Sequence, residues 1–99
     1  MEISIKIAAK ISLKTLDQIQ RIEVNRVLDS IEKVEDFDQL KIDKYILKRL
    51  NGFETYTIKI SENLRMIVDV ENNDTVTILD IMTGEKAKYL NAYIKGEKE

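Results

Sequence analysis

The sequence predicts an α+β domain in which an N-terminal strand and a helical hairpin precede an antiparallel, three-stranded meander that completes one sheet. Apolar residues alternate with polar ones in residues 2–8, recur at every third or fourth position in residues 12–34, and alternate again in residues 56–82. No linker or repeat divides the 99 residues. We therefore expect a single domain over residues 1–94 and a frayed, charged tail over residues 95–99.

The first strand is predicted from the segment EISIKIA, where Ile3, Ile5 and Ile7 alternate with polar residues. The helical region follows, and Ser12 and Asp17 are both plausible N-caps. One long helix or a hairpin broken near Asp17 would fit, and we favour the hairpin. Its apolar stripe consists of Leu13, Leu16, Ile19, Val24, Val27, Leu28, Ile31 and Val34.

The segment between the hairpin and the meander is expected to hold an acidic loop and a short last helix. EDFD, residues 35–38, would form the loop. DKYILKRLNG, residues 43–52, would form one or two helical turns that end at Asn51 and Gly52, because both residues tolerate positive φ. Its cations Lys48 and Arg49 would then lie at a helix C-terminus, where they complement the helix dipole.

The meander is predicted from three alternating runs, YTIKIS, LRMIVDV and TVTILDIM, separated by the turns SEN and ENND. Two registers are possible for its first hairpin. A three-residue loop, residues 62–64, places Lys59 and Arg65 on the same face, whereas a two-residue loop, residues 62–63, places them on opposite faces. We favour the three-residue loop.

Composition excludes several kinds of site. The sequence has no Cys and no His, so it cannot form a disulfide, a Cys-His zinc site, a thiol nucleophile or an imidazole base. No run of residues is apolar enough for a membrane span or a signal peptide, so a cytoplasmic protein is expected. The net charge of −2 gives no general attraction to nucleic acid. We expect no metal and no cofactor.

The segment LKRLNGFETYTIKISENLRMIVDVENNDTVTILDI resembles the RelE/ParE superfamily of toxin-antitoxin toxins. Members commonly have a Leu and a Gly before the meander, a Tyr-x-Ile-Lys-Ile strand, a polar turn, an Arg that opens the next strand, and a last strand rich in Ile and Val. The matching residues are Leu50, Gly52, Tyr56, Ile58, Lys59, Ile60, Asn63, Arg65, Ile67 and 78–81, with Ala9, Leu13 and Leu16 near the start.

The resemblance implies a RelE/ParE-like fold and the toxin component of a type II toxin-antitoxin system, with a cognate antitoxin as its partner. A RelE-like member would be a ribosome-dependent mRNA endonuclease, an mRNA interferase, that binds the ribosome and mRNA and inhibits translation without a metal. Two alternatives remain open. The chain would act on DNA gyrase without cleaving RNA if it is ParE-like, or it is a non-toxic member that serves as a small protein-interaction module.

The resemblance implies a reaction in which a ribose 2′-hydroxyl attacks the adjacent phosphate, and this requires cations near the phosphate and groups that move protons at the attacking and leaving oxygens. The resemblance assigns catalytic roles to Arg65, Lys59, Tyr89 and Lys86. The charge distribution indicates a basic rim where residues 39–50 and 82–99 meet the sheet, and substrate binding is expected there from Lys48, Arg49 and Lys88. Many members carry Gly-His-Arg where this chain has Met82, Thr83 and Gly84, so Lys86 or Lys88 would have to supply the missing cation.

Two further expectations concern the meander and the partner. Lys59 and Arg65 can also be read as ordinary cross-strand partners of Asp69 and Glu71. An apolar groove between the hairpin and the meander, lined by Phe37, Met66 and Met82, is expected to take an antitoxin segment.

Overall fold

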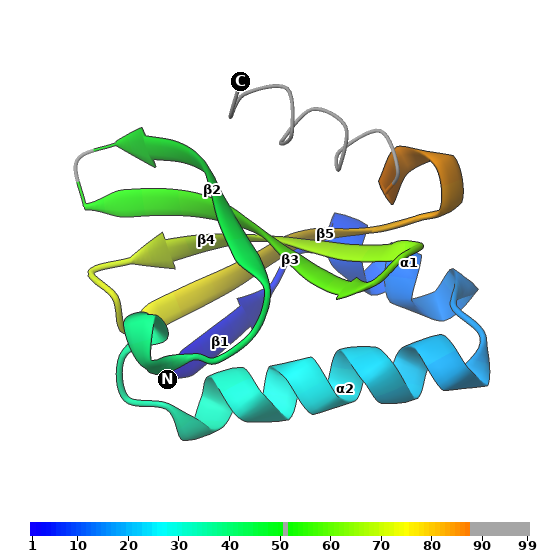
Figure 1. Cartoon of the computed structure of the whole chain (residues 1–99), viewed down its shortest axis with the longest axis horizontal. Helices are drawn as coiled ribbons and strands as arrows, with labels where there is room; N and C mark the ends of the chain where they lie inside the picture. The colour runs from blue at the N-terminus through cyan, green and yellow to red at the C-terminus, as the bar shows by residue number, and fades with distance from the viewer. Residues whose placement is uncertain (51, 88–99) are drawn as a thin grey trace.

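The computed structural model describes residues 1–50 and 52–87, and Figure 1 shows their arrangement. Within these residues, two α-helices and a short 3-10 helix are combined with five strands, and the last described residues, 84–87, are also helical. No helix in these residues has the length and apolar content needed to cross a membrane. The elements are β1 (Glu2–Ile5), α1 (Ile7–Thr15), α2 (Gln18–Lys33), the 3-10 helix η1 (Phe37–Gln39), β2 (Lys44–Leu50), β3 (Phe53–Ser61), β4 (Leu64–Glu71) and β5 (Thr75–Thr83).

All five strands form one mixed sheet with the order β1-β5-β4-β3-β2. β2 to β5 are a continuous antiparallel meander, and β1 joins its far edge in parallel with β5. The α1–α2 hairpin carries the chain from β1 back toward the opposite edge strand, β2. The fold class expected from the sequence is confirmed, although the meander has four strands rather than three.

The break between the two helices falls at Leu16 and Asp17, as the hairpin interpretation requires. Asp17 is the N-cap of α2: its carboxylate accepts the backbone N–H of Gln20 at 2.8 Å, and the Gln20 side chain accepts the N–H of Asp17 at 3.2 Å. This capping box satisfies two N–H groups that the first helical turn leaves free. The second N-cap considered, Ser12, lies inside α1 and caps nothing.

The prediction for residues 43–52 was wrong, because this segment is the edge strand β2 and not a helix. Tyr45 pairs with Thr57 and Ile46 with Tyr56, but the register then shifts, so that Lys48 pairs with Thr55. Lys48 and Arg49 therefore lie on a strand, and no helix dipole acts on them.

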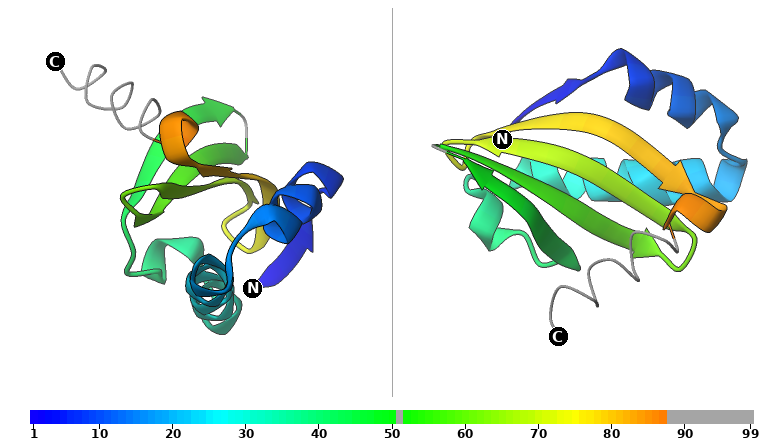
Figure 2. Two further views of the ribbon diagram at one scale, coloured as in Figure 1. Left: turned by 90° about the vertical axis from the view of Figure 1, so that its right-hand side faces the viewer. Right: turned by 90° about the horizontal axis from the view of Figure 1, so that it is seen from above.

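The core lies between the helices and one face of the sheet. Val24 and Ile31 of α2 and Ala9 of α1 belong to the same buried cluster as the inward-facing residues of the meander. These are Tyr56, Ile58, Leu64, Met66, Val68, Val70, Val76 and Ile78. Figure 2 shows α2 crossing this face, with α1 beside the β1–β5 edge. The long apolar stripe of the hairpin is thus used for packing on the sheet.

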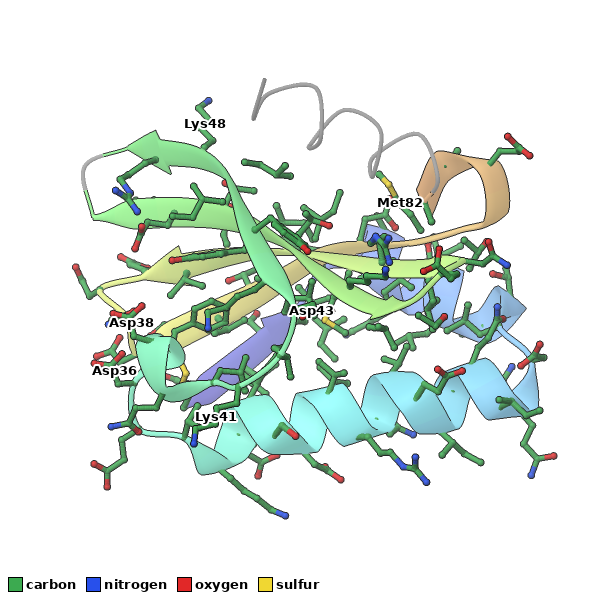
Figure 3. All side chains as sticks on the ribbon, viewed as in Figure 1. Asp36, Asp38, Lys41, Asp43, Lys48 and Met82 are labelled. Carbon is green, nitrogen blue, oxygen red and sulfur yellow. The ribbon has the colours of Figure 1, made fainter. Side chains whose placement is uncertain are left out.

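The loop after α2 is anchored to the core by Phe37. Its ring is fully buried, lies 4.7 Å from the Tyr56 ring between centroids, and has the Lys44 ammonium 5.6 Å from its centroid. Around it, Asp36 caps η1 and accepts the side-chain N–H of Asn73 from the β4–β5 turn. Figure 3 shows Asp36 and Asp38 at this end of the molecule. The EDFD segment is therefore a packed connection.

The expected apolar groove between hairpin and meander does not form with the residues proposed for it. Phe37 and Met66 have no exposed surface, and Met82 lies beside Arg65 on the face of the sheet that points away from α2. The exposed apolar residues lie elsewhere. Ile7 is the clearest case: it was expected to continue the first strand, yet it begins α1 and is 75% exposed.

Candidate functional site

The two cations of the first hairpin of the meander lie directly opposite each other. Lys59 of β3 pairs with Arg65 of β4, and Arg65 pairs in turn with Met82 of β5. Directly opposed residues of antiparallel strands share a face. Because the neighbouring Ile58, Met66 and Ile81 belong to the core cluster, this row faces away from α2. The expectation that Lys59 and Arg65 share a face is confirmed, but the register is neither of the two considered.

Arg65 is the most unusual residue of this row, since its side chain is only 1% exposed. Its Nη1 donates to the carbonyl oxygens of Ser61 and, at 3.3 Å, of Leu64. Nε and Nη2 have no hydrogen-bond partner among the described residues. Burial lowers the pKa of the guanidinium, and the negative charge of Glu62 opposes this effect. Arginine stays charged in proteins despite such shifts, so three N–H bonds of a charged group, one on Nε and two on Nη2, are left to bind an acceptor.

Thr57 places a second unpartnered polar atom on the same face. It lies on β3 two residues before Lys59, pairs with Ile67, and is fully buried. Its Oγ1 has no hydrogen-bond partner in the described part of the chain. A buried polar atom without a partner costs roughly 1–3 kcal/mol. Thr57 and Arg65 thus lie on adjacent strands and on the same face. One residue pair of the ladder separates their two pairs, and both side chains have polar atoms without a hydrogen-bond partner among the described residues.

Lys59 is already engaged by a carboxylate. Its Nζ lies 2.9 Å from Oε1 of Glu62 in the β3–β4 turn, and 29% of the Lys59 side chain is exposed. The alternative partners considered for the two cations do not apply. Asp69 accepts the hydroxyl of Thr55, and Glu71 lies at the far end of the β3–β4 ladder, opposite Phe53.

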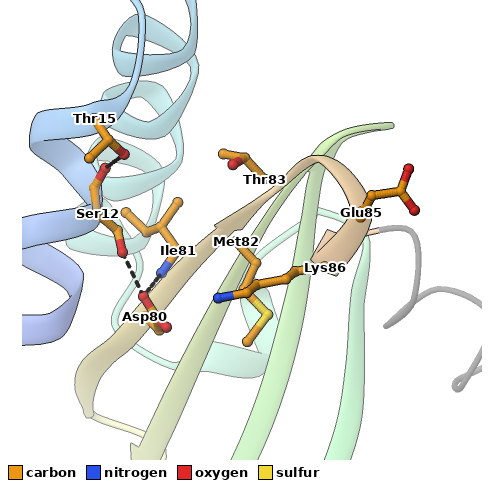
Figure 4. Close-up of a pocket in the computed structure, with 8 residues that line it drawn as sticks. All are labelled: Ser12, Thr15, Asp80, Ile81, Met82, Thr83, Glu85 and Lys86. Carbon is orange, nitrogen blue, oxygen red and sulfur yellow. Dashed lines mark hydrogen bonds between the residues drawn. The ribbon is translucent and has the colours of Figure 1, made fainter.

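A pocket of about 340 Å³ adjoins this row at the end of β5. It is lined by Ser12 and Thr15 of α1, by residues 80–83 of β5, and by Glu85 and Lys86 after the strand. Ser12 donates to Asp80 at 2.8 Å, and the same Asp80 oxygen accepts the N–H of Ile81 (Figure 4). Lys86 and Met82 both line this pocket (Figure 4). Met82 thus belongs both to the pocket and to the Arg65 row.

Of the remaining predicted site residues, Lys48 and Arg49 do not lie near the Arg65 row. Lys48 pairs with Thr55 and Arg49 with Glu54, at least four residues from Lys59 along β3, which is about 13 Å of strand. Lys48 lies near the opposite end of the sheet from Met82 (Figure 3). Arg49 also forms a 2.8 Å ion pair with Glu54. Tyr89 and Lys88 lie outside the described residues.

Sequence reasoning missed Thr57, Asp80 and Ser12. Asp80 left a signal, because it is a charge inside the otherwise apolar last strand, where a carboxylate needs a partner. The hydroxyls of Thr57 and Ser12 left none, since threonine is common in strands and serine is common everywhere. Among the described residues, no group of three or more His, Cys, Asp or Glu side chains is arranged to hold a metal ion.

Sequence comparisons give no match, either to a protein-family model or to a curated protein. Solved structures do match. The archaeal RelE-RelB complex from Pyrococcus horikoshii OT3 has a chain that superposes with a TM-score of 0.69 at 17% identity, over 83% of this chain and 92% of that one. The RelB-RelE antitoxin-toxin complex from Methanococcus jannaschii has one that superposes with a TM-score of 0.67 at 16% identity, over 91% and 96%. The chain therefore has the fold of RelE toxins.

Proposed function

We propose that this chain is the toxin component of a toxin-antitoxin pair and that it inhibits translation by cleaving mRNA bound to the ribosome. Two solved structures that share its fold are complexes of RelE with the antitoxin RelB, and this supports an antitoxin as the partner of the present chain. The RelE resemblance of the sequence supports the choice of RNA as its target.

The observation that carries the proposal is the unused N–H groups of Arg65. A guanidinium binds phosphate oxygens through two parallel N–H bonds, and Nε and Nη2 are free of partners within the described residues. Lys59 lies directly opposite, and Lys86 lies in the adjoining pocket. A phosphate held by Arg65 would thus meet two further cations. Because Arg65 is buried in this structure, contact with RNA requires this face to open locally.

A second candidate, a toxin of the same fold that does not cleave RNA, is favoured by a different observation. Lys59 is neutralised by Glu62, and the residue opposite Arg65 on β5 is Met82. A thioether cannot move a proton, so the only acid or base among Lys59, Arg65 and Met82 is Lys59, which is held in the ion pair with Glu62. If Arg65 has only a structural role, the fold would serve to bind a protein target such as DNA gyrase.

The experiment that separates the two candidates is a cleavage assay on ribosomes programmed with a defined mRNA. The wild-type chain is expected to cut the message only when ribosomes are present. Arg65→Lys keeps the charge but loses the fork of N–H groups, and it is expected to lower the cleavage rate by roughly two orders of magnitude. Wild-type protein that cuts no message on ribosomes would refute the cleavage proposal.

The matched control is Arg26→Lys. Arg26 is exposed on α2, which packs on the face of the sheet opposite the Arg65 row. The substitution should leave the cleavage rate unchanged within about twofold, because it keeps the charge and alters only an exposed side chain. Circular dichroism and urea unfolding of both variants would show whether a loss of cleavage reflects a loss of fold.

A further inference from the structure

The pocket of about 340 Å³ at the end of β5 contains polar groups that the proposed cleavage does not use. Ser12, Thr15 and Thr83 carry hydroxyl groups, and Asp80 and Glu85 carry carboxylates. Small-molecule pockets in proteins usually have volumes of about 300–1,000 Å³, so this one is large enough for a nucleobase. A ligand of this pocket needs polar groups of its own to match such a lining.

Asp80 is held in place by α1 and still has one oxygen to offer. Its Oδ1 accepts the hydroxyl of Ser12 at 2.8 Å and the backbone N–H of Ile81 at 2.8 Å (Figure 4). Its Oδ2 accepts no hydrogen bond from the described residues. A carboxylate has about four lone-pair sites, so those of Oδ2 are left for a ligand. Because two bonds fix Oδ1, the direction of Oδ2 is fixed as well.

Lys86 brings the opposite charge to the same pocket without neutralising Asp80. Both residues line the pocket, yet neither belongs to an ion pair within the described part of the chain. A carboxylate only accepts hydrogen bonds, and an ammonium only donates them. The ligand that suits both therefore has N–H donors on one edge and an acceptor atom on the next.

The pocket adjoins the place where the proposed function puts a phosphate. Arg65 pairs with Met82, and Ile67 pairs with Asp80. Arg65 and Asp80 are thus diagonal neighbours on adjacent strands, and such neighbours lie about 7–8 Å apart. Met82 belongs both to the Arg65 row and to the pocket lining. A nucleotide with its phosphate at Arg65 could therefore place its base in this pocket.

We propose that this pocket binds a guanine base. Guanine has N–H donors at N1 and N2 on one edge and the acceptors O6 and N7 beside them. The N–H groups would donate to Oδ2 of Asp80, and the Lys86 ammonium would donate to O6. Met82 would pack on the face of the base, as apolar side chains do in pockets that hold a single base. This assignment rests on the proposed function and adds to it the base that lies beside the bound phosphate.

Asp80 selects guanine because a carboxylate can only accept hydrogen bonds. Guanine presents two adjacent N–H donors to it. Adenine and cytosine each present an amino group beside a ring nitrogen that is itself an acceptor, and uracil presents one N–H between two carbonyl oxygens. Each of these three bases would bring an acceptor against the carboxylate. RNA-binding proteins read unstacked bases on these same edges.

The test is a titration of the full chain with guanosine, adenosine, cytidine and uridine monophosphates (GMP, AMP, CMP and UMP), followed by heteronuclear NMR. All four carry the same ribose and phosphate, so differences in affinity report the base. GMP is expected to bind about tenfold more tightly than the other three. Inosine monophosphate, which lacks only the N2 amino group of GMP, should bind about fivefold more weakly than GMP. Equal affinities for GMP and inosine monophosphate, or no saturable binding of GMP up to about 10 mM, would overturn the proposal.

Matched variants locate the site. Asp80→Asn keeps one oxygen for Ser12 and Ile81 and replaces the other by an N–H donor, so the preference for GMP over AMP should fall below about twofold. Asp69→Asn is the control, because it removes the same charge from a carboxylate that bonds Thr55 outside the pocket, and it should keep the preference. An equal loss of preference in the two variants would refute this location. If Asp80→Asn does not fold, the comparison of GMP with inosine monophosphate on the wild-type chain still decides.

The outcomes separate the guanine pocket from the proposed function, since nucleotide binding is measured without ribosomes. A chain that cleaves message on ribosomes but binds the four nucleotides equally would refute the guanine pocket alone. A chain that prefers GMP and cleaves no message would refute the cleavage proposal and leave the guanine pocket standing.

Discussion

Removal of the Glu62 charge should strengthen RNA binding at the Arg65 row. Glu62 lies in the β3–β4 turn, 2.9 Å from the Lys59 ammonium, and its charge also acts on Arg65. Glu62→Gln keeps the size of the side chain and removes the carboxylate charge. Because the Glu62 side chain is 81% exposed, the free energy of unfolding should change by less than about 0.5 kcal/mol.

The magnitude follows from the geometry. A phosphate held by Lys59 would lie about 4 Å from the ammonium and hence about 6 Å from the Glu62 carboxylate. Coulomb's law gives a repulsion of about 0.7 kcal/mol at that separation in water, and about twice that at half the dielectric constant of water. Removing the repulsion should raise the affinity between about threefold and tenfold.

The assay is fluorescence anisotropy of a labelled RNA oligonucleotide with increasing salt. If Glu62→Gln releases Lys59 for one more phosphate contact, the slope of log affinity against log salt should become steeper by about 0.7. Glu54→Gln is the matched control, because it releases Arg49 from an equivalent pair at the other end of the sheet and makes the same change in net charge. Equal gains in RNA affinity for the two variants would mean that only the net charge of the protein matters. That result would refute the assignment of the phosphate site to the Arg65 row.

Three stability predictions follow from individual contacts, each measured by urea unfolding. Asp17→Ala removes the capping box of α2 and should cost about 1 kcal/mol; an unchanged midpoint would contradict this account of the helix start. Phe37→Ala empties a fully buried site and should cost about 3–5 kcal/mol, whereas the exposed Phe53→Ala should cost less than about 1 kcal/mol. Burial raises the pKa of the Tyr56 hydroxyl above 10.0, so the unfolded chain loses this proton first and stability should fall as the pH rises above about 10. Tyr56→Phe should reduce that alkaline loss, and an identical pH profile would argue against the shift.

The elements with regular periodicity could be predicted from the sequence. In β4 and β5 apolar residues alternate with polar ones, and in α2 apolar residues recur at every third or fourth position, because one side of each element is buried. The helix break at Asp17 is predicted by the capping box, which is a local sequence signal. β2 could not be predicted this way. The shift between Ile46 and Lys48 interrupts its alternation, so that apolar residues at Tyr45, Ile46 and Leu47 mimic a helical turn.

The site could be predicted from the sequence only in part, because its geometry depends on the β3–β4 turn. Lys59, Arg65 and Lys86 were chosen by resemblance, and the structure brings them to one end of the sheet. The burial of Arg65 was not foreseeable, because arginine is among the residues least often buried. Its carbonyl partners, Ser61 and Leu64, flank the β3–β4 turn, and their positions follow only from the geometry of that turn.

That geometry depends on one extra residue in β3. The turn after β3 has two residues, since Ser61 pairs with Leu64. In a regular ladder such a turn would place Lys59 opposite Met66 and send Lys59 and Arg65 to opposite faces. The register shift between Lys59 and Ser61 leaves Ile60 without a partner and brings Lys59 opposite Arg65. A second shift, between Ile67 and Val68, leaves Leu79 unpaired and places Asp80 opposite Ile67. Bulges often re-aim side chains beside functional sites, and here the two bulges bring Lys59 and Asp80 to the face that holds Arg65.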